Sequence, residues 1–253
     1  MYEHDEVTML NTSVHVYGIF IFLSIIVGTI IICKNSKSDM NDKFEMICFI
    51  FYIILGTIFG AKYFTLLTNF DKFRNYDFFE IGLSSYGAVI GLLIIIIIFS
   101  KQFKKNMEDI LYNVITVVPL MYSIGKMGCF FVGCCYGIEY NGIFSITYNY
   151  SYSAPNFVKL FPVQLVESVL FLIIFIYLIF KKQKEEDKTK IICDTIILCS
   201  LSKFTLDYFR NSHKNTIISI NQIVSLIFCL IFIYIKLKRK KANGRVRYLE
   251  SNK

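Results

Sequence analysis

The 253-residue chain contains no tryptophan, and only 18% of its residues are charged. A soluble domain has about 25% charged residues and shorter apolar runs. The chain is instead 55% hydrophobic with a mean hydropathy of +0.54, and it contains the run GLLIIIIIF at Gly91–Phe99. Without tryptophan, the aromatic belts of a membrane protein must come from tyrosine and phenylalanine. The composition predicts an all-α polytopic membrane protein.

Seven apolar segments are candidates for transmembrane helices, because a bilayer core about 30 Å thick needs roughly 20 apolar residues per helix. The fourth segment is the weakest, since it carries Asn113, Thr116 and Pro119. The expected spans are about Val14–Cys33, Phe44–Leu67, Leu83–Ser100, Ile110–Ile124, Pro162–Phe180, Ile191–Tyr208 and Ile217–Leu237.

Most of the basic residues lie in alternate connections between these spans, which predicts the orientation of the chain. They gather in Lys34–Lys43, Lys101–Lys105, Lys181–Lys190 and the tail from Lys236. We therefore expect the N-terminus outside, the C-terminus in the cytoplasm, and a basic tail (about 238–253) beside anionic lipid heads. The net charge of +8 then reflects topology and argues against a nucleic-acid partner.

The chain lacks an internal repeat, so the inverted-repeat transporter architecture gains no support. It also lacks a basic segment before the first span, so that span is expected to be retained rather than cleaved as a signal peptide. We expect one membrane-embedded domain over residues 1–253 with a small outward-facing cap at about 125–161. Within the cap, Gly142–Tyr152 alternates apolar and polar residues, which predicts a short strand or hairpin.

Polar groups within spans are costly, so each is a functional hypothesis. Four basic residues near the outward ends predict an anion site, with a lipid phosphate as the anion. Structural alternatives stay open: an i,i+4 ion pair, interfacial positions, belt tyrosines and a snorkelling lysine. The residues concerned are Tyr17, Lys62, Tyr86, Lys126, Gln164, Glu167, Lys203, Asp207, Arg210 and Gln222.

Three cysteines lie in the glycine-rich stretch GKMGCFFVGCCYG, Gly125–Gly137. Cys129, Cys134 and Cys135 have neither CxxC spacing nor a neighbouring histidine, which argues against zinc. A disulfide from Cys129 to one of the other two is an alternative on an oxidising face. Close packing in a glycine-rich re-entrant turn is the third alternative. The remaining five cysteines are scattered among apolar residues and are expected to be small hydrophobes.

Seven fragments, in order along most of the chain, resemble motifs of the prolipoprotein diacylglyceryl transferase family of bacterial membrane enzymes. GKMGCFFVGCCYG is similar to the family signature GRxGNFxNGExxG, and FPVQLVES is similar to HPxQLYE. The others are VHVYGIF, GAKYF, GLSSYGAVIG, SKFTLDYFR and SINQIVS. The sequence departs from these family motifs at several positions, and Lys62 in GAKYF stands where the family has an arginine. Lys126 and Lys203 replace arginines, Tyr86 replaces a histidine, Cys129 replaces an asparagine and Cys134 replaces a glutamate.

The resemblance implies transfer of a diacylglyceryl group from phosphatidylglycerol to the lipobox cysteine of a preprolipoprotein, with release of glycerol 1-phosphate. The implied partners are phosphatidylglycerol, preprolipoprotein signal peptides and the bilayer of the bacterial cytoplasmic membrane, with no cofactor and no metal. A divergent paralogue acting on another lipid or acceptor, or a non-enzymatic transporter or channel, is the alternative.

The resemblance also implies roles for individual residues. Lys126, Lys203 and Arg210 would clamp the phosphate together with Lys62. Tyr86 and Tyr17 would orient or deprotonate the acceptor. The supporting residues would be Glu167, Asp207, Gln164, Gln222, Gly128, Gly133 and Gly137.

Overall fold

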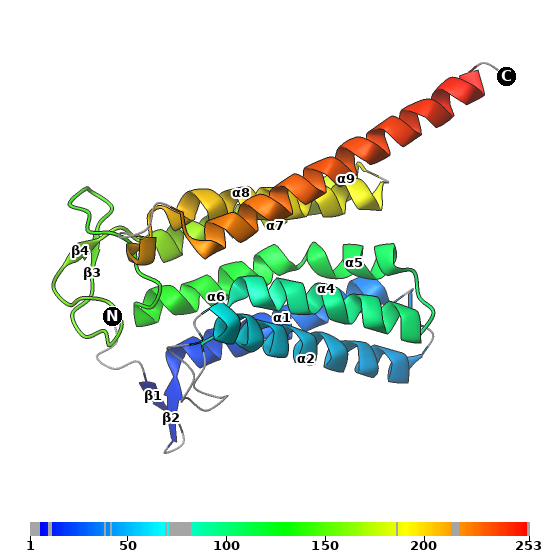
Figure 1. The fold of residues 1–253 in the computed structure, drawn as a ribbon. Helices are drawn as coiled ribbons and strands as arrows, with labels where there is room; N and C mark the ends of the chain where they lie inside the picture. Colours follow the sequence, from blue (N-terminus) through cyan, green and yellow to red (C-terminus); the bar gives the residue numbers. More distant parts are fainter. Residues whose placement is uncertain are drawn as a thin grey trace. The chain divides into compact units, whose positions relative to one another are not determined.

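The computed structural model describes residues 6–9, 12–37, 39–40, 42–68, 70, 82–185, 187–213 and 218–251. Contacts divide the chain into two compact units, and helices form most of each (Figure 1). The first unit comprises residues 1–28 and 115–253, and the second comprises residues 29–114. The pattern of apolar spans in the sequence does not indicate this division.

The second unit is built around α2 (Lys43–Thr68) and α4 (Ser85–Gln102). It also holds the end of α1 (Val16–Ser36) and most of α5 (Met107–Ile115). Glycines let α2 and α4 approach closely: a Cβ on Gly91 would lie 2.1 Å from the Gly56 carbonyl oxygen, and one on Gly87 would lie 2.3 Å from that of Gly60. Small residues in membrane helices allow two backbones to come into contact, and this contact stabilises the packing of the helices.

The first unit packs helices that follow one another in the chain. α6 (Val118–Val132) contacts α7 (Val163–Lys182), α7 contacts α8 (Lys188–Asp207), and α8 contacts α9 (Ile220–Ser251). Ser123 of α6 and Ser168 of α7 each donate a hydrogen bond to the other's carbonyl oxygen, at 2.8 and 2.9 Å. These reciprocal bonds satisfy two buried hydroxyls and fix the register of α6 against α7.

The other elements of the first unit lie at the ends of its helices. The antiparallel strands β1 (Glu6–Met9) and β2 (Thr12–His15) precede α1, and the 3-10 helix η1 (Asn211–His213) follows α8.

The segment between α6 and α7, residues 133–161, forms the cap. Its strands β3 (Ile146–Thr147) and β4 (Lys159–Leu160) pair antiparallel around a small core of Tyr148, Ala154 and Leu160. A short strand is therefore present where the alternation predicted one, although its partner comes from the return to α7. The predicted cap boundary at residue 125 is wrong, because α6 continues to Val132 and only Gly133–Gly137 of the glycine-rich stretch lies outside the helix.

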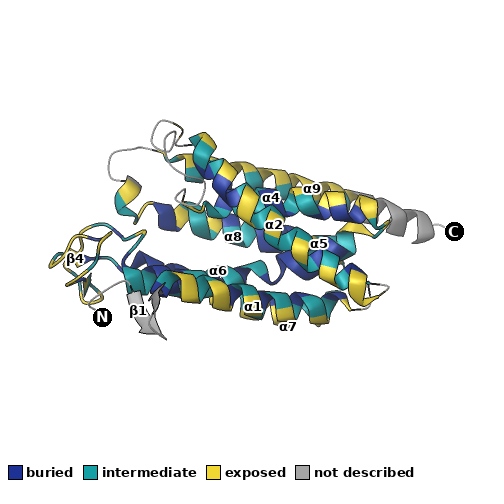
Figure 2. Ribbon diagram, turned by 90° about the horizontal axis from the view of Figure 1, so that it is seen from below, coloured by how far each residue is buried: buried dark blue, intermediate teal, exposed yellow. Residues whose placement is uncertain are grey.

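Six helical segments of the described chain are long and apolar enough to cross a membrane. Large apolar side chains such as Phe22, Phe51 and Leu230 are exposed on them, as expected of surfaces that face lipid. Exposed positions recur along these helices in Figure 2. These segments confirm the prediction of an all-α polytopic membrane protein. The remaining expected span, Ile191–Tyr208, corresponds to α8, which is helical but carries charged residues, including Asp194, Lys203 and Asp207, and is not among the six. The orientation of the spans stays a prediction.

Candidate active site

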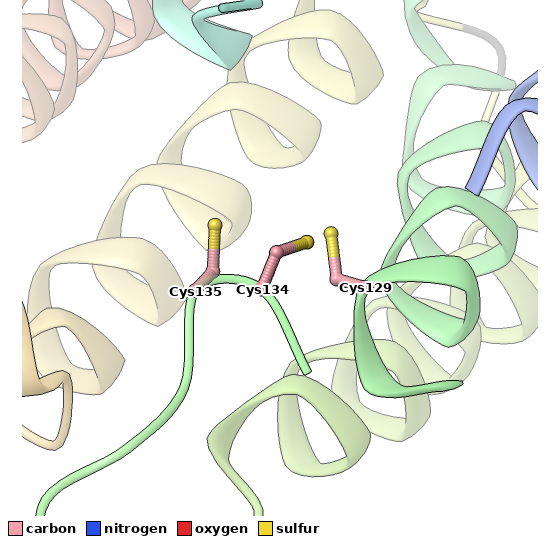
Figure 3. A group of neighbouring side chains, drawn as sticks. All are labelled: Cys129, Cys134 and Cys135. Carbon is pink, nitrogen blue, oxygen red and sulfur yellow. The ribbon is translucent and has the colours of Figure 1, made fainter. Parts of the chain in front are cut away.

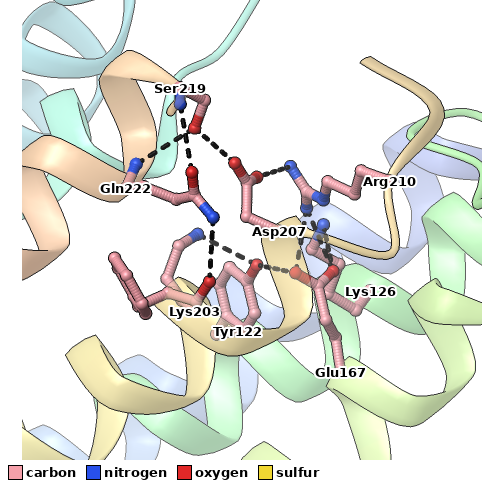
Figure 4. Close-up of polar contacts among 9 residues, drawn as sticks. Tyr122, Lys126, Glu167, Lys203, Asp207, Arg210, Ser219 and Gln222 are labelled. Atoms are coloured by element: carbon pink, nitrogen blue, oxygen red, sulfur yellow. Dashed lines mark hydrogen bonds and ion pairs between the residues drawn. The ribbon is translucent and has the colours of Figure 1, made fainter. Parts of the chain in front are cut away.

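A buried carboxylate, that of Glu167 on α7, lies at the centre of a polar cluster in the first unit (Figure 4). Only 1% of Glu167 is exposed. The Lys126 ammonium lies 2.5 Å from Oε2, and Arg210 Nη2 donates to both carboxylate oxygens at 3.0 Å. A buried carboxylate needs such partners, because an unpaired charge in a low-dielectric interior is strongly unfavourable.

Tyr122 connects this carboxylate to a second lysine. Its hydroxyl donates to Glu167 Oε1 at 3.2 Å and accepts a hydrogen bond from Lys203 Nζ at 3.0 Å. Its ring also lies under both ammonium groups, with Lys126 Nζ 5.3 Å and Lys203 Nζ 4.5 Å from the centroid. These are cation–π distances. The motif comparison missed Tyr122, although its position four residues before Lys126 places it on the same face of α6.

Asp207 holds the other side of Arg210. Arg210 Nη1 lies 3.8 Å from Asp207 Oδ1, and the Ser219 hydroxyl donates to Asp207 Oδ2. Ser219 also begins α9, since its hydroxyl accepts from the Gln222 backbone N–H at 3.1 Å, as an N-cap does. The Gln222 side chain links the start of α9 to α8: it accepts a hydrogen bond from Ser219 N at 3.0 Å and donates one to the Phe204 carbonyl at 3.3 Å. The sequence did not single out Ser219, although it opens the SINQIVS motif.

Arg210 is positioned by backbone pairing with the start of the cap. The Ile138 N–H donates to the Phe209 carbonyl at 3.0 Å, and the Asn211 N–H donates to the Tyr136 carbonyl at 3.2 Å. Gly137 lies between these bonds, where a Cβ would come within 2.2 Å of the Phe161 carbonyl oxygen. Gly137 thus allows the chain after α8 to lie against the cap and direct Arg210 at Glu167.

The cluster carries an excess of positive charge. Three cations, Lys126, Lys203 and Arg210, accompany two carboxylates, so the ionised groups sum to one net positive charge. Arg210 Nε is buried and has no hydrogen-bond partner among the described residues. Burial lowers the pKa of Arg210, but the Glu167 carboxylate raises it, and the pKa lies well above its ordinary value. A net cation with an unused N–H donor is a suitable site for an anion.

Other predicted residues shape the surroundings of the cluster. Gln164 is fully buried and donates to the Cys134 carbonyl oxygen at 2.9 Å. Gly128 faces α1, where a Cβ would lie 2.7 Å from Phe20 Cβ and 3.4 Å from the Tyr17 ring. Tyr17 therefore lies against α6 at Gly128, which is two residues after Lys126 in the sequence.

Lys62 and Tyr86 belong to the second unit. Both side chains are buried, at 9% and 8% exposure, Lys62 near the end of α2 and Tyr86 in the first turn of α4. Nearby, the Ser84 N–H donates to the Ala61 carbonyl at 3.3 Å, and Ser84 caps α4. The role of Lys62 in an anion site and the role of Tyr86 at the acceptor both stay predictions.

The fold and the cluster define a helical membrane protein with a buried, net-positive polar site. A sequence profile described as prolipoprotein diacylglyceryl transferase matches residues 6–237. The chain therefore belongs to the prolipoprotein diacylglyceryl transferase family.

Curated relatives span nearly the same length. The chain is 25% identical over 247 residues to phosphatidylglycerol–prolipoprotein diacylglyceryl transferase 2 of Clostridium perfringens (strain 13 / Type A), which covers 93% of this chain and 96% of the relative. It is 24% identical over 235 residues to the corresponding transferase of Clostridium tetani, and the match covers 90% of this chain and 94% of that relative. It is 27% identical over 220 residues to the transferase of Campylobacter curvus, and the match covers 80% of this chain and 79% of that relative.

Proposed function

We propose that this protein transfers a diacylglyceryl group from phosphatidylglycerol to the lipobox cysteine of a preprolipoprotein in the bacterial cytoplasmic membrane. The sulfur forms a thioether bond to the glyceryl carbon, the bond from that carbon to the phosphate oxygen breaks, and glycerol 1-phosphate leaves. The thiol proton is released in the same reaction. Family membership supports the reaction class, and the relatives' names supply the donor and acceptor.

The observation that carries this proposal is the net-positive cluster around Glu167. Negative charge accumulates on the phosphate as the carbon–oxygen bond breaks, so fixed cations there stabilise the transition state. Lys126, Lys203 and Arg210 are the proposed phosphate ligands. The Nε of Arg210, which has no partner in the part of the chain that the structure describes, is one donor that a phosphate oxygen could use. Glu167 and Asp207 would hold these cations in place between turnovers.

The acceptor needs a different kind of group, because the thiolate and not the thiol is the nucleophile. Tyr17 and Tyr86 are the proposed residues that orient or deprotonate the acceptor thiol. The unperturbed pKa of tyrosine is about 10, so a tyrosine is a weaker base than histidine near neutral pH and works better as a hydrogen-bond donor. Lys62 is proposed as a further contact to the phospholipid head.

The test is to incubate the detergent-purified protein with phosphatidylglycerol and a lipobox peptide and to read the peptide mass. We expect the added mass of one diacylglyceryl group. Lys203→Met should lower the rate about 100–1000-fold, which is the usual cost of removing one transition-state donor. Lys159→Met, which removes an exposed lysine in β4, is the matched control and should keep the rate. Full activity of Lys203→Met would contradict the proposal.

A second candidate is a paralogue that uses another lipid or acceptor. The departures from the family motifs favour it: Lys126 and Lys203 keep the charge of the family's arginines, but an ammonium cannot hold a phosphate bidentately. Complementation of cells depleted of their own transferase distinguishes the two. A protein that inserts correctly but does not rescue growth supports the paralogue.

A further inference from the structure

Three thiols meet at the end of α6, beside the proposed phosphate site. The sulfur atoms of Cys129, Cys134 and Cys135 all lie within 4.8 Å of one another, and all three are free thiols (Figure 3). Cys129 is buried in the last turns of α6, Cys134 is half-buried, and Cys135 is exposed. The proposed transfer reaction uses none of them.

The backbone folds back sharply to bring the sulfurs together. α6 ends at Val132, and Gly133 adopts the left-handed conformation with φ 82° while its N–H donates to the Cys129 carbonyl at 2.9 Å. Cys135 also has a positive φ, of 54°, which is uncommon for a residue other than glycine. Two left-handed residues in this short stretch return the chain over the helix end, so Cys134 points at Cys129 in Figure 3. The turn itself brings the sulfur atoms together, so the cysteines can form a cluster without CxxC spacing in the sequence.

Side chains from the cap and α7 fasten the turn. The Tyr148 hydroxyl donates to the Phe130 carbonyl and the Ser151 hydroxyl donates to the Val132 carbonyl, both at 2.9 Å. Gln164 of α7 donates to the Cys134 carbonyl at 2.9 Å. The carbonyls of both the helix end and the turn are therefore held, and the thiols are pre-organised. A metal site gains affinity from such fixed supporting bonds.

The ligand set favours a soft metal ion. Thiolates select ions such as Cu(I) and Zn(II), whereas oxygen ligands suit Mg(II) and Ca(II). Ligands bound at about 2.3 Å to one metal lie roughly 4 Å apart, so sulfurs within 4.8 Å need only a small closure. Structural zinc takes four protein ligands. In the described residues this group contains three, with no histidine or carboxylate, which matches three-coordinate Cu(I) better.

The surrounding charge agrees with an anionic metal–thiolate centre. One Cu(I) with three thiolates carries a net charge of −2. Lys126 lies three residues before Cys129 on α6, and Arg210 pairs through its backbone with Gly137, two residues after Cys135. They would partly neutralise this charge in a site where uncompensated charge is costly.

We propose that Cys129, Cys134 and Cys135 bind one soft, thiophilic metal ion, with Cu(I) as the best fit. The proposal does not rest on the transferase reaction, since the three cysteines take no part in it, although the neighbouring Lys126 and Arg210 are also the proposed phosphate ligands. Each thiol loses its proton and each sulfur forms one bond to the ion, with no change in oxidation state.

The test titrates reduced, detergent-purified protein with Cu(I) under anaerobic conditions against a coloured Cu(I) chelator. We expect one ion per chain. Cys129→Ser, Cys134→Ser and Cys135→Ser should each weaken binding more than about 100-fold, because loss of even an outer-shell partner costs 10–100-fold. The matched control keeps these three and replaces the other five cysteines with serine, and it should bind one ion with unchanged affinity. The replaced residues are Cys33, Cys48, Cys193, Cys199 and Cys229.

A second measurement counts the sulfurs. Cd(II) bound to thiolates gives a charge-transfer absorption whose intensity follows the number of bound sulfurs, so the wild-type protein should show three and each serine variant fewer. Binding that persists in the variant lacking all three cysteines overturns the proposal. Absence of binding in the reduced wild-type protein, or a disulfide between two of the three in protein isolated without reductant, overturns it equally.

Discussion

Replacing Glu167 with glutamine tests whether the buried cluster is held by charge balance. Glutamine has nearly the same shape, but it removes one of two carboxylates from beside Lys126 and Arg210, whose nitrogens lie 2.5 and 3.0 Å from the Glu167 oxygens. The ionised groups would then sum to +2 instead of +1. Removing one partner of a buried ion pair costs about 3–5 kcal/mol, because the remaining charge is unpaired. We expect the free energy of unfolding of Glu167→Gln to fall by about this amount.

A second substitution should recover stability without recovering activity. Lys126→Met combined with Glu167→Gln returns the sum to +1, so more than half of the lost stability should return. The transfer rate should stay low, since Lys126 is a proposed phosphate ligand. Lys159→Met combined with Glu167→Gln is the matched control: it also removes one lysine, but an exposed one, and it should recover nothing.

Stability is measured by unfolding in mixed micelles of a mild detergent and SDS. Activity is measured from the mass that a lipobox peptide gains on lipidation. Wild-type stability of Glu167→Gln would refute the charge-balance argument. Equal recovery by the Lys126 and Lys159 double variants would refute it as well, because recovery would then not depend on the contact with Glu167.

Two glycines give further predictions, both measured by unfolding in the same mixed micelles. Gly133→Ala should lower the free energy of unfolding by at least about 1–2 kcal/mol, because φ is 82° and the new Cβ would lie 2.5 Å from Ser151 Oγ; a neutral result would contradict the left-handed helix end. Gly91→Ala should cost about 1–3 kcal/mol by overpacking against the Gly56 carbonyl. Gly18→Ala, whose new Cβ would have no atom of the described residues beyond its own helix turn within 4 Å, should stay within about 0.5 kcal/mol of wild type. An equal loss in both variants would argue against close packing of α2 on α4.

The helices could be predicted from the sequence where hydropathy alone determines them. The expected span Phe44–Leu67 differs from α2 (Lys43–Thr68) by one residue at each end. The fourth expected span, about Ile110–Ile124, is too short, because the apolar residues give way there to glycines and a lysine. In the structure α6 continues to Val132, since Gly128 packs against Phe20 and the lysine pairs with Glu167. These two contacts join residues that are distant in the sequence, so no local sequence pattern predicts them.

The partners of the charged residues were harder to predict than the residues themselves. The spacing of Lys203 and Asp207 suggested an i,i+4 ion pair, whereas the observed bonds include Lys203 to the hydroxyl of Tyr122 and Asp207 to Ser219 and Arg210. The sequence does not single out Tyr122, because a tyrosine in an apolar helix resembles a residue of the aromatic belt at the membrane surface. Only its contacts with α7 and α8, which are distant in sequence, distinguish it from one.

Lys126 and Lys203 stand where the resembled motifs have arginines, so in the proposed site directional recognition of the phosphate falls to Arg210. Lys126 and Lys203 offer point charges, while a guanidinium offers a planar fork of donors. Arg210 Nη2 is occupied by Glu167, Nη1 lies 3.8 Å from Asp207, and Nε has no partner among the described residues. An arriving phosphate could therefore bond to Nε without displacing Glu167, and it would bring the net charge of the cluster from +1 toward zero. In the proposed mechanism, Glu167 is a permanent counter-ion that keeps the empty site folded, and the excess positive charge is left to bind the substrate phosphate.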